Sequence, residues 1–229
     1  MLTVFHHPLC PHSRYVRLIL GEYGIESRLV EERFWERREE FLLLNPAGET
    51  PVAVAEGVPA VPGAAIIAEF VEETSGKQGD GALLPAHPND RVEVRRLASW
   101  FNDKFHAEVS GPLVAERVFK RFMTQAQGGG SPDTGALRAA RHNIRYHLAY
   151  VGWLARTRDW LAGERLSLAD LAAAAHLSAC DYLGEVPWSE DEAAKHWYAR
   201  VKSRPAFRSI LADTLAGLPP PASYADLDF

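Results

Sequence analysis

The 229-residue chain is poor in sulfur, with only two cysteines and two methionines. Cys10 and Cys180 lie far apart in the sequence, so we expect neither a disulfide framework nor a zinc site. No apolar run reaches the roughly 18 residues that a membrane-spanning helix needs. These absences predict a reduced, cytoplasmic protein without a membrane partner, and a chain of this length can bury a large core unaided.

Positive charges are outnumbered by negative ones. The chain has 25 Lys and Arg against 30 Asp and Glu, which gives a formal net charge of −5. Proteins that hold nucleic acid by its phosphates carry a basic surface, so we expect no nucleic-acid partner. The N-terminus has no basic start followed by an apolar run, and therefore no signal peptide is expected.

Short apolar segments alternate with helical patterns in the first third of the chain. Strands are expected at residues 2–5, 28–31, 52–54 and 58–61, and helices at 13–23, 39–44 and 64–74. Gly24 stands where the first helix should end, as a C-cap. The order β-α-β-α-β-β-α predicts a small α/β domain over residues 1–76, with helices on a mixed sheet.

The rest of the chain has a helical pattern. Residues 77–90 are polar, contain Gly and Pro and lack a period, which predicts a linker. A long helix is predicted by the apolar positions Leu137, Ile144, Leu148, Val151 and Leu154. Residues 171–177 are small or apolar except His176, which predicts a buried central helix. We therefore expect residues 91–229 to form an all-helical domain.

A capping box precedes the expected buried helix. Ser167 can accept a hydrogen bond from the Asp170 N–H, and Asp170 can accept one from the Ser167 N–H. Its role is expected to be structural.

The segment Cys10-Pro11-His12-Ser13 lies between the first strand and the first helix. A thiol at this point faces unpaired N–H groups and the positive end of the helix dipole, which favour a thiolate. Cys10 and Ser13 are thus candidates for thiol chemistry. The alternative is that Cys10 is only a small residue in a loop.

A proline begins the third strand. If the Thr50-Pro51 bond is cis, the backbone of Thr50 is available to pair with an extended peptide. The alternative is an ordinary turn before an edge strand. The nine histidines show no ligand spacing, so no metal site is expected.

Together these motifs resemble the cytosolic glutathione transferases over nearly the whole chain. The resemblance is carried by the Cys10–Ser13 loop, the segment Asn45 to Pro51, and the late capping box before a buried helix. It implies a thioredoxin-like N-terminal domain, an all-α C-terminal domain and a homodimer. It also implies that Cys10 or Ser13 is the active residue, and that Thr50 and cis-Pro51 hold glutathione.

One position departs from the family pattern. Family members carry Glu-Ser at the start of the helix after the hairpin, where both side chains hold the γ-glutamyl carboxylate. This chain has Gly63-Ala64 there. The helix N–H groups remain as an anion site, so glutathione binding is expected to be weak rather than absent. No cofactor is expected to be required.

Other segments resemble one subgroup, the FtsZ-localised, glutathione-transferase-like division proteins of alphaproteobacteria. They are residues 118–122, 128–130, 143–148 and 224–229. This resemblance implies a non-catalytic protein that binds FtsZ filaments at the division site and regulates constriction. The alternatives are a glutathione transferase that acts on electrophiles through Cys10 or Ser13, and a small-molecule carrier.

Three places are candidates for the partner surface. Trp35 lies in the highly charged stretch 31–39 and is expected to be exposed, although it could instead pack across the domain junction. Glu116 and Arg117 are the second choice. The third is the acidic end of the chain, where residues 219–221 are all proline and should lead it away from the helices. Its candidate residues are Asp226, Asp228 and Phe229.

Overall fold

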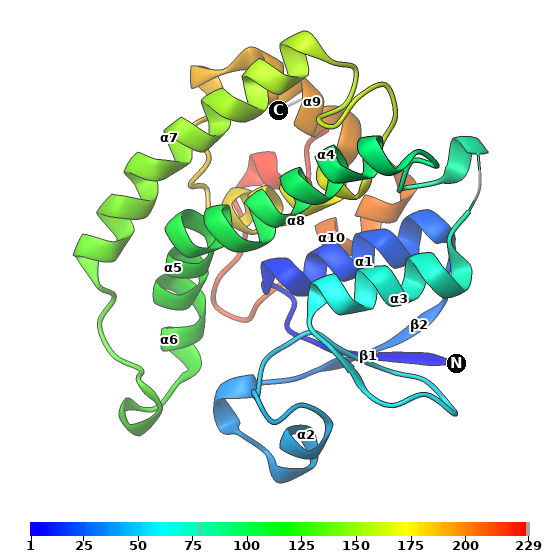
Figure 1. Ribbon diagram of the computed structural model, residues 1–229. Helices are drawn as coiled ribbons and strands as arrows, with labels where there is room; N and C mark the ends of the chain where they lie inside the picture. The colour runs from blue at the N-terminus through cyan, green and yellow to red at the C-terminus, as the bar shows by residue number, and fades with distance from the viewer. Residues whose placement is uncertain (78, 228–229) are drawn as a thin grey trace.

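The computed structural model describes residues 1–77 and 79–227, in two parts that pack against each other (Figure 1). The N-terminal part contains β1 (Leu2–His6), α1 (Pro11–Tyr23), β2 (Ser27–Glu31), α2 (Glu39–Leu44), β3 (Val52–Val54), β4 (Val61–Pro62) and α3 (Ala64–Ser75). This is the expected order of strands and helices. The strands form one mixed sheet in the order β2-β1-β3-β4, with only β1 and β2 parallel. In Figure 1, α1 and α3 lie between the sheet and the helical part, and α2 lies on the other side.

Local chemistry explains the boundaries of α1 and β4. Pro11 begins α1, where its missing N–H costs nothing, and Gly24 ends the helix with φ 67° as expected. The last strand is shorter than the sequence pattern predicts, at two residues instead of four. Pro59 has no N–H for a sheet ladder, and the Val58 N–H is used in a turn to Ala55.

The C-terminal part is all-helical, which together with the mixed sheet confirms the expected fold class. Its first rod consists of α4 (Pro88–Ser99), a π-helical stretch (Trp100–Ser110), α5 (Gly111–Val114), a second π-helical stretch (Ala115–Phe119) and α6 (Lys120–Phe122). It continues with α7 (Thr134–Thr157), α8 (Leu168–Tyr182), α9 (Glu192–Lys202) and α10 (Arg208–Leu211). In the part of the chain that is described, no helix is long and apolar enough to span a bilayer.

The helix α8 is the centre of the core, as the apolar run predicted. Every residue from Leu168 to Tyr182 is buried, and α1 from the other part packs along it. The long helix α7 buries the five apolar positions that its sequence pattern marked. The capping box is also confirmed. The Ser167 N–H donates to Asp170 Oδ2 at 3.0 Å, and the Ser167 side chain accepts from backbone N–H groups in the first turn of α8.

Candidate functional site

Two loops meet at the start of α1. Cys10 is the N-cap of the helix, and its Sγ lies 3.6 Å from the backbone oxygen of Thr50. The Thr50-Pro51 peptide bond is cis, as the family resemblance implied. Cys10 is buried in this structure. The arrangement places the thiol, the Thr50 backbone and the end of the sheet at one point.

The surroundings of Cys10 favour a thiolate. Burial acts to raise its pKa, but hydrogen bonds and charge from His12 and hydrogen bonds from Ser13 outweigh burial, so the pKa is lowered. The pKa of His12 shifts the opposite way: burial acts to lower it, and the thiolate raises it. Ser13 is fully buried in the first turn of α1, so its hydroxyl lies beside the sulfur without competing water.

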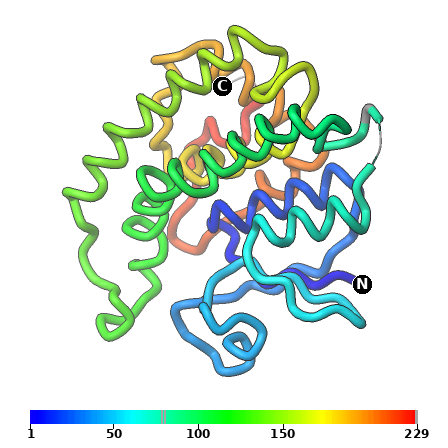
Figure 2. The backbone as a smooth tube through the Cα atoms, viewed as in Figure 1, coloured from blue at the N-terminus to red at the C-terminus, as the bar shows by residue number. Residues whose placement is uncertain are grey.

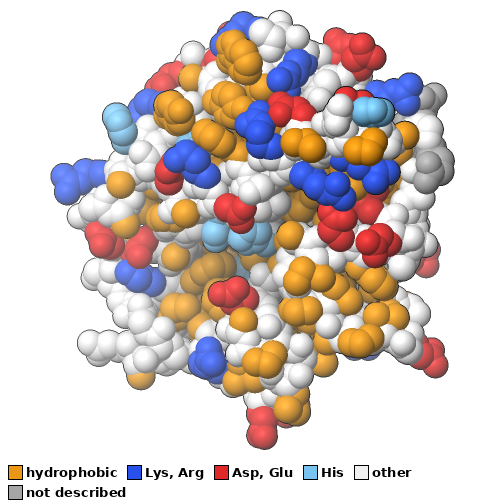
Figure 3. Space-filling view, in the orientation of Figure 1, with side chains coloured by type: hydrophobic (Ala, Val, Ile, Leu, Met, Phe, Trp, Pro, Cys, Tyr) orange, Lys and Arg blue, Asp and Glu red, His pale blue; other side chains and the backbone are white. Residues whose placement is uncertain are grey.

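A cleft of about 750 Å³ opens between the two parts beside this loop. Its lining includes Cys10, His12, Phe34, Thr50, His106 and Phe119. Histidine side chains lie at the hollow between the two parts in Figure 3. A neighbouring cavity of about 370 Å³ continues along the cis-proline to the start of α3.

The start of α3 presents backbone without anchoring side chains. Gly63 is the N-cap, with φ 85° and ψ 140°, and Ala64 is the first helical residue. Both line the smaller cavity. The N–H groups of the helix can still receive an anion there, but neither residue can add a charge or a hydroxyl. The absence of these contacts at Gly63 and Ala64 agrees with the expectation of weak glutathione binding, which stays a prediction.

The fold brings together three histidines whose spacing gave no signal. The rings of His12 and His106 have centroids 4.3 Å apart, and His176 lies 5.1 Å from His12. Asn102 supports the group: its backbone oxygen is 2.8 Å from His12 Nε2, and its side-chain oxygen is 3.1 Å from His176 Nε2. Ser110 Oγ lies 2.8 Å from His176 Nδ1. No set of residues within the described ranges could hold a metal ion.

Trp35 is buried, so the expectation of an exposed side chain is wrong. It lies in the short 3₁₀ turn Phe34–Glu36 with 8% of its surface exposed. Its ring packs against His7 of its own domain and Phe119 of the helical part, with centroids 5.5 and 5.4 Å away. Glu31, Arg33 and Glu36 are exposed while the indole packs at the domain junction, the alternative that the sequence left open.

Glu116 and Arg117 are occupied within the molecule. Glu116 accepts from Lys120 Nζ at 2.6 Å and from the Asp133 N–H at 2.7 Å. Arg117 donates to the backbone oxygen of Leu183 at 3.1 Å and pairs with Glu185. Glu116 lies three residues before Phe119, so it is on the same rod as the aromatic partner of Trp35.

The end of the chain does not leave the helices after the three prolines, which corrects the sequence-based expectation. Figure 2 shows it returning past the start of α1. Tyr224 is fully buried because the core offers its ring a place against Tyr182, with centroids 5.2 Å apart. Asp226 is exposed and acts electrostatically on Lys202. The other two candidates, Asp228 and Phe229, lie outside the described residues.

Two family models match this chain. The N-terminal domain of glutathione S-transferase matches residues 9–74, and the C-terminal domain matches residues 101–205. The chain is 48% identical to "FtsZ-localized protein A" of Caulobacter vibrioides over 99% of this chain and 98% of the relative.

Two solved structures share the whole fold. One is a glutathione S-transferase from Sinorhizobium meliloti 1021, 54% identical, with a TM-score of 0.98 and full coverage of both chains. The other is FzlA from C. crescentus, 48% identical, with a TM-score of 0.92, covering 100% of this chain and 99% of that one. With both domain models matched and relatives this similar over their full length, the chain belongs to the glutathione S-transferase family.

Proposed function

We propose that this protein binds FtsZ filaments at the division site and regulates constriction, without depending on glutathione chemistry. The observation that carries the proposal is the 48% identity, over 99% of the chain, to the FtsZ-localized protein A of Caulobacter vibrioides. The match spans 99% of the chain, so it covers the helical part and the C-terminal segment, where the candidate partner residues Glu116, Arg117 and Asp226 lie.

The site at the start of α3 supports a binding role over conjugation. Gly63 and Ala64 offer only backbone to a carboxylate. A hydrogen bond to a charged group contributes about 1.5–3 kcal/mol, so its loss weakens binding roughly tenfold to hundredfold. A thiolate at Cys10 then has no firmly held substrate beside it.

A glutathione transferase is the second candidate, and the Cys10 loop favours it. The pKa of this thiol is lowered despite burial, and the cleft beside it adjoins cis-Pro51. A thiolate at a helix N-terminus is suited to exchange with, or attack on, an electrophilic sulfur or carbon.

Two measurements on the purified protein separate the candidates. Co-sedimentation with polymerised FtsZ should deplete the protein from the supernatant, and calorimetry should detect glutathione only weakly. Cys10→Ala and Ser13→Ala should each leave co-sedimentation unchanged. A micromolar glutathione constant together with no co-sedimentation would favour the enzyme.

We further propose a homodimer. Large apolar side chains are exposed on three helices: Ile66 of α3 by 57%, Val92 of α4 by 65% and Trp153 of α7 by 51%. A surface with these side chains on one copy of the chain can pair with the same surface on a second copy across a two-fold axis. Sedimentation velocity should give a dimer, and Ile66→Glu should shift it toward the monomer.

A further inference from the structure

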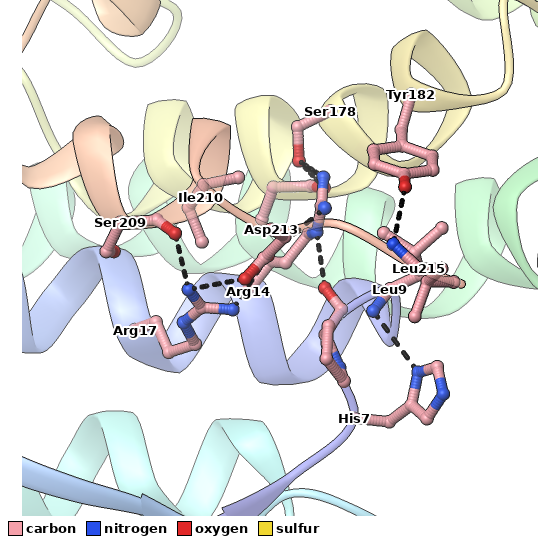
Figure 4. A network of polar contacts seen from close by, with 12 residues as sticks. His7, Leu9, Arg14, Arg17, Ser178, Tyr182, Ser209, Ile210, Asp213 and Leu215 are labelled. Atoms are coloured by element: carbon pink, nitrogen blue, oxygen red, sulfur yellow. Dashed lines mark hydrogen bonds and ion pairs between the residues drawn. The ribbon is translucent and has the colours of Figure 1, made fainter. Parts of the chain in front are cut away.

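The loop that carries Cys10 is fixed by contacts on both sides of this residue. The Cys10 N–H donates to the His7 backbone oxygen at 2.9 Å, and Figure 4 shows the Leu9 N–H donating to His7 Nδ1, at 3.2 Å. Arg14, in the first turn of α1, donates to the Pro8 backbone oxygen at 2.7 Å. Cys10 is only 7% exposed, but it lines the cleft of about 750 Å³. A small molecule in the cleft therefore meets a sulfur that is held in one position.

The pKa values of the three histidines beside this sulfur are pushed apart. Burial acts to lower the pKa of His12, but the Cys10 thiolate and the Asp103 carboxylate act against burial, and the pKa is raised. Burial, followed by the charge on His12, lowers the pKa of His106 to about 4, and burial also lowers the pKa of His176. His12 is therefore the protonated member of the group, and it can donate a proton at the sulfur.

The backbone oxygen of Thr50 is an acceptor beside the same sulfur. In its thiol form Cys10 donates to this oxygen, which lies 3.6 Å from Sγ. An oxygen atom that is bonded to the sulfur and carries a hydrogen can use the same acceptor. A carbonyl substrate would instead develop an oxyanion, which the Thr50 oxygen repels, and the Ser13 N–H is already directed at the sulfur. The geometry therefore favours a substrate oxygen that brings its own proton.

The walls of the cleft favour a substrate with a hydrocarbon body. Phe34, Val114, Phe119 and Met123 contribute apolar side chains to its lining. Burial of apolar surface against such side chains is favourable by about 25 cal/mol per Å². A molecule with a hydrocarbon group should therefore reach the sulfur more readily than a small polar one.

We propose that Cys10 is a modification site for organic hydroperoxides, which oxidise it to a sulfenic acid within the cleft and without glutathione. The thiolate attacks the O–H oxygen of the hydroperoxide, so that an S–O bond forms as the O–O bond breaks. The sulfur loses two electrons, and the hydroperoxide gains them and leaves as an alcohol. The leaving alkoxide takes its proton from the His12 imidazolium, and the new S–O–H group donates to the Thr50 oxygen. Because no step involves FtsZ or glutathione, this inference does not rest on the proposed function.

Chemical labelling of the reduced, full-length protein tests the proposal, with cumene hydroperoxide as the oxidant and dimedone as the trap for sulfenic acid. Mass spectrometry should find one adduct per chain, on Cys10. Cys180 is the internal control, because its burial in α8 raises the pKa of its thiol and should leave it unlabelled. Relative to free cysteine, the gain in rate should be about tenfold larger for cumene hydroperoxide than for hydrogen peroxide.

Two results of this labelling would contradict the proposal. If Cys10 reacts no faster than free cysteine, it is not a site for hydroperoxides. If the gain in rate is the same for both oxidants, the cleft does not select a hydrocarbon body, and the substrate class is wrong.

His12→Gln tests the proton donor, because a neutral amide cannot supply the proton, and oxidation should slow about a hundredfold. The wild-type rate should fall at low pH, where the thiolate is protonated, and at high pH, where His12 loses its proton. The fall at high pH should be absent from His12→Gln. The matched control is His196→Gln, since the side chain of His196 is 78% exposed, and it should keep the wild-type rate and pH profile. A slower His12→Gln that retains the fall at high pH, or one with an unchanged rate, would overturn proton donation by His12.

Discussion

The ring of Trp35 packs on the ring of Phe119 with centroids 5.4 Å apart, although the two residues belong to different domains. Phe34 also touches Phe119, with centroids 5.0 Å apart, and both Phe34 and Phe119 line the cleft. The charged stretch around Trp35 is therefore fixed to the helical rod that carries Glu116. A substitution at Trp35 therefore alters the packing between the two domains rather than the exposed surface.

Trp35→Ala should lower the free energy of unfolding by about 3 kcal/mol, because it removes a large buried side chain from between two domains. Tyr146→Ala is the control, since that aromatic side chain is 65% exposed and its loss should cost less than about 1 kcal/mol. Urea unfolding followed by circular dichroism measures both. Equal stability of Trp35→Ala and the wild type would show that the junction does not depend on this ring.

Asp170→Ala should be more destabilising than Ser167→Ala. Besides the Ser167 N–H, the Asp170 carboxylate accepts from the Leu161 N–H and from Trp197 Nε1, both at 2.9 Å. We expect about 3 kcal/mol for Asp170→Ala, which removes the acceptor of these three N–H groups and of the Ser167 hydroxyl, and about 1 kcal/mol for the cap residue. Urea unfolding would contradict this account if the two variants were equally stable.

The fold could be predicted because its signals are local or periodic. The capping box at Ser167, the cap at Gly24 and the apolar stripe of α7 each follow from a few neighbouring residues. The burial of Tyr224 could not be predicted in this way. Its partners Arg14 and Ile210 are contributed by distant parts of the chain, and three prolines before it suggested a departing tail.

The candidate site was predictable only in part. The sequence placed the Cys10 loop at a helix N-terminus and Pro51 before a strand, but the cis bond at Pro51 was implied only by the family resemblance. The association of His12 with His106 and His176 has no sequence period, because it is made by α1 packing against two other helices. Burial of Trp35 was missed because its neighbours in the sequence are charged.

His106 should make stability depend on pH. Burial, followed by the charge on His12, lowers the pKa of His106 from 6.5 to about 4. Between these values the unfolded chain binds a proton that the folded protein does not, so the free energy of unfolding falls as pH drops from 6.5 to 4. His106→Gln should remove on the order of 2 kcal/mol of that fall, after allowance for screening.

Urea unfolding at the two ends of that pH range, for the wild type and His106→Gln, isolates the effect from the other titrating groups. The control is His196→Gln, because the side chain of His196 is 78% exposed. An identical pH dependence of the wild type and His106→Gln would refute the prediction.

Ala64→Ser should strengthen glutathione binding about tenfold, because it adds a hydroxyl at the start of α3 where a carboxylate can accept from it. Gly63→Glu is a second variant at the same site, and it differs from Ala64→Ser because the new side chain stands on a residue with positive φ. A side chain added at Gly63 meets no atom within 4 Å, but its φ of 85° strains any residue with a Cβ. Calorimetry with glutathione measures both constants. An unchanged constant for Ala64→Ser would mean that the ligand carboxylate does not reach this helix.

Glu116→Lys should weaken FtsZ co-sedimentation about tenfold or more, as expected for a hot-spot residue. The substitution also breaks the contacts to Lys120 and the Asp133 N–H, so a loss alone would not show that Glu116 touches the partner. Glu116→Gln resolves this, because its amide oxygen can still accept from Asp133 while its charge is gone. If Glu116 meets a cation of the partner, both variants bind weakly and only Glu116→Lys speeds hydrogen exchange near residue 133. If Glu116→Gln binds as the wild type does, the charge of Glu116 has no part in recognition, and Glu116 is not a partner-binding residue.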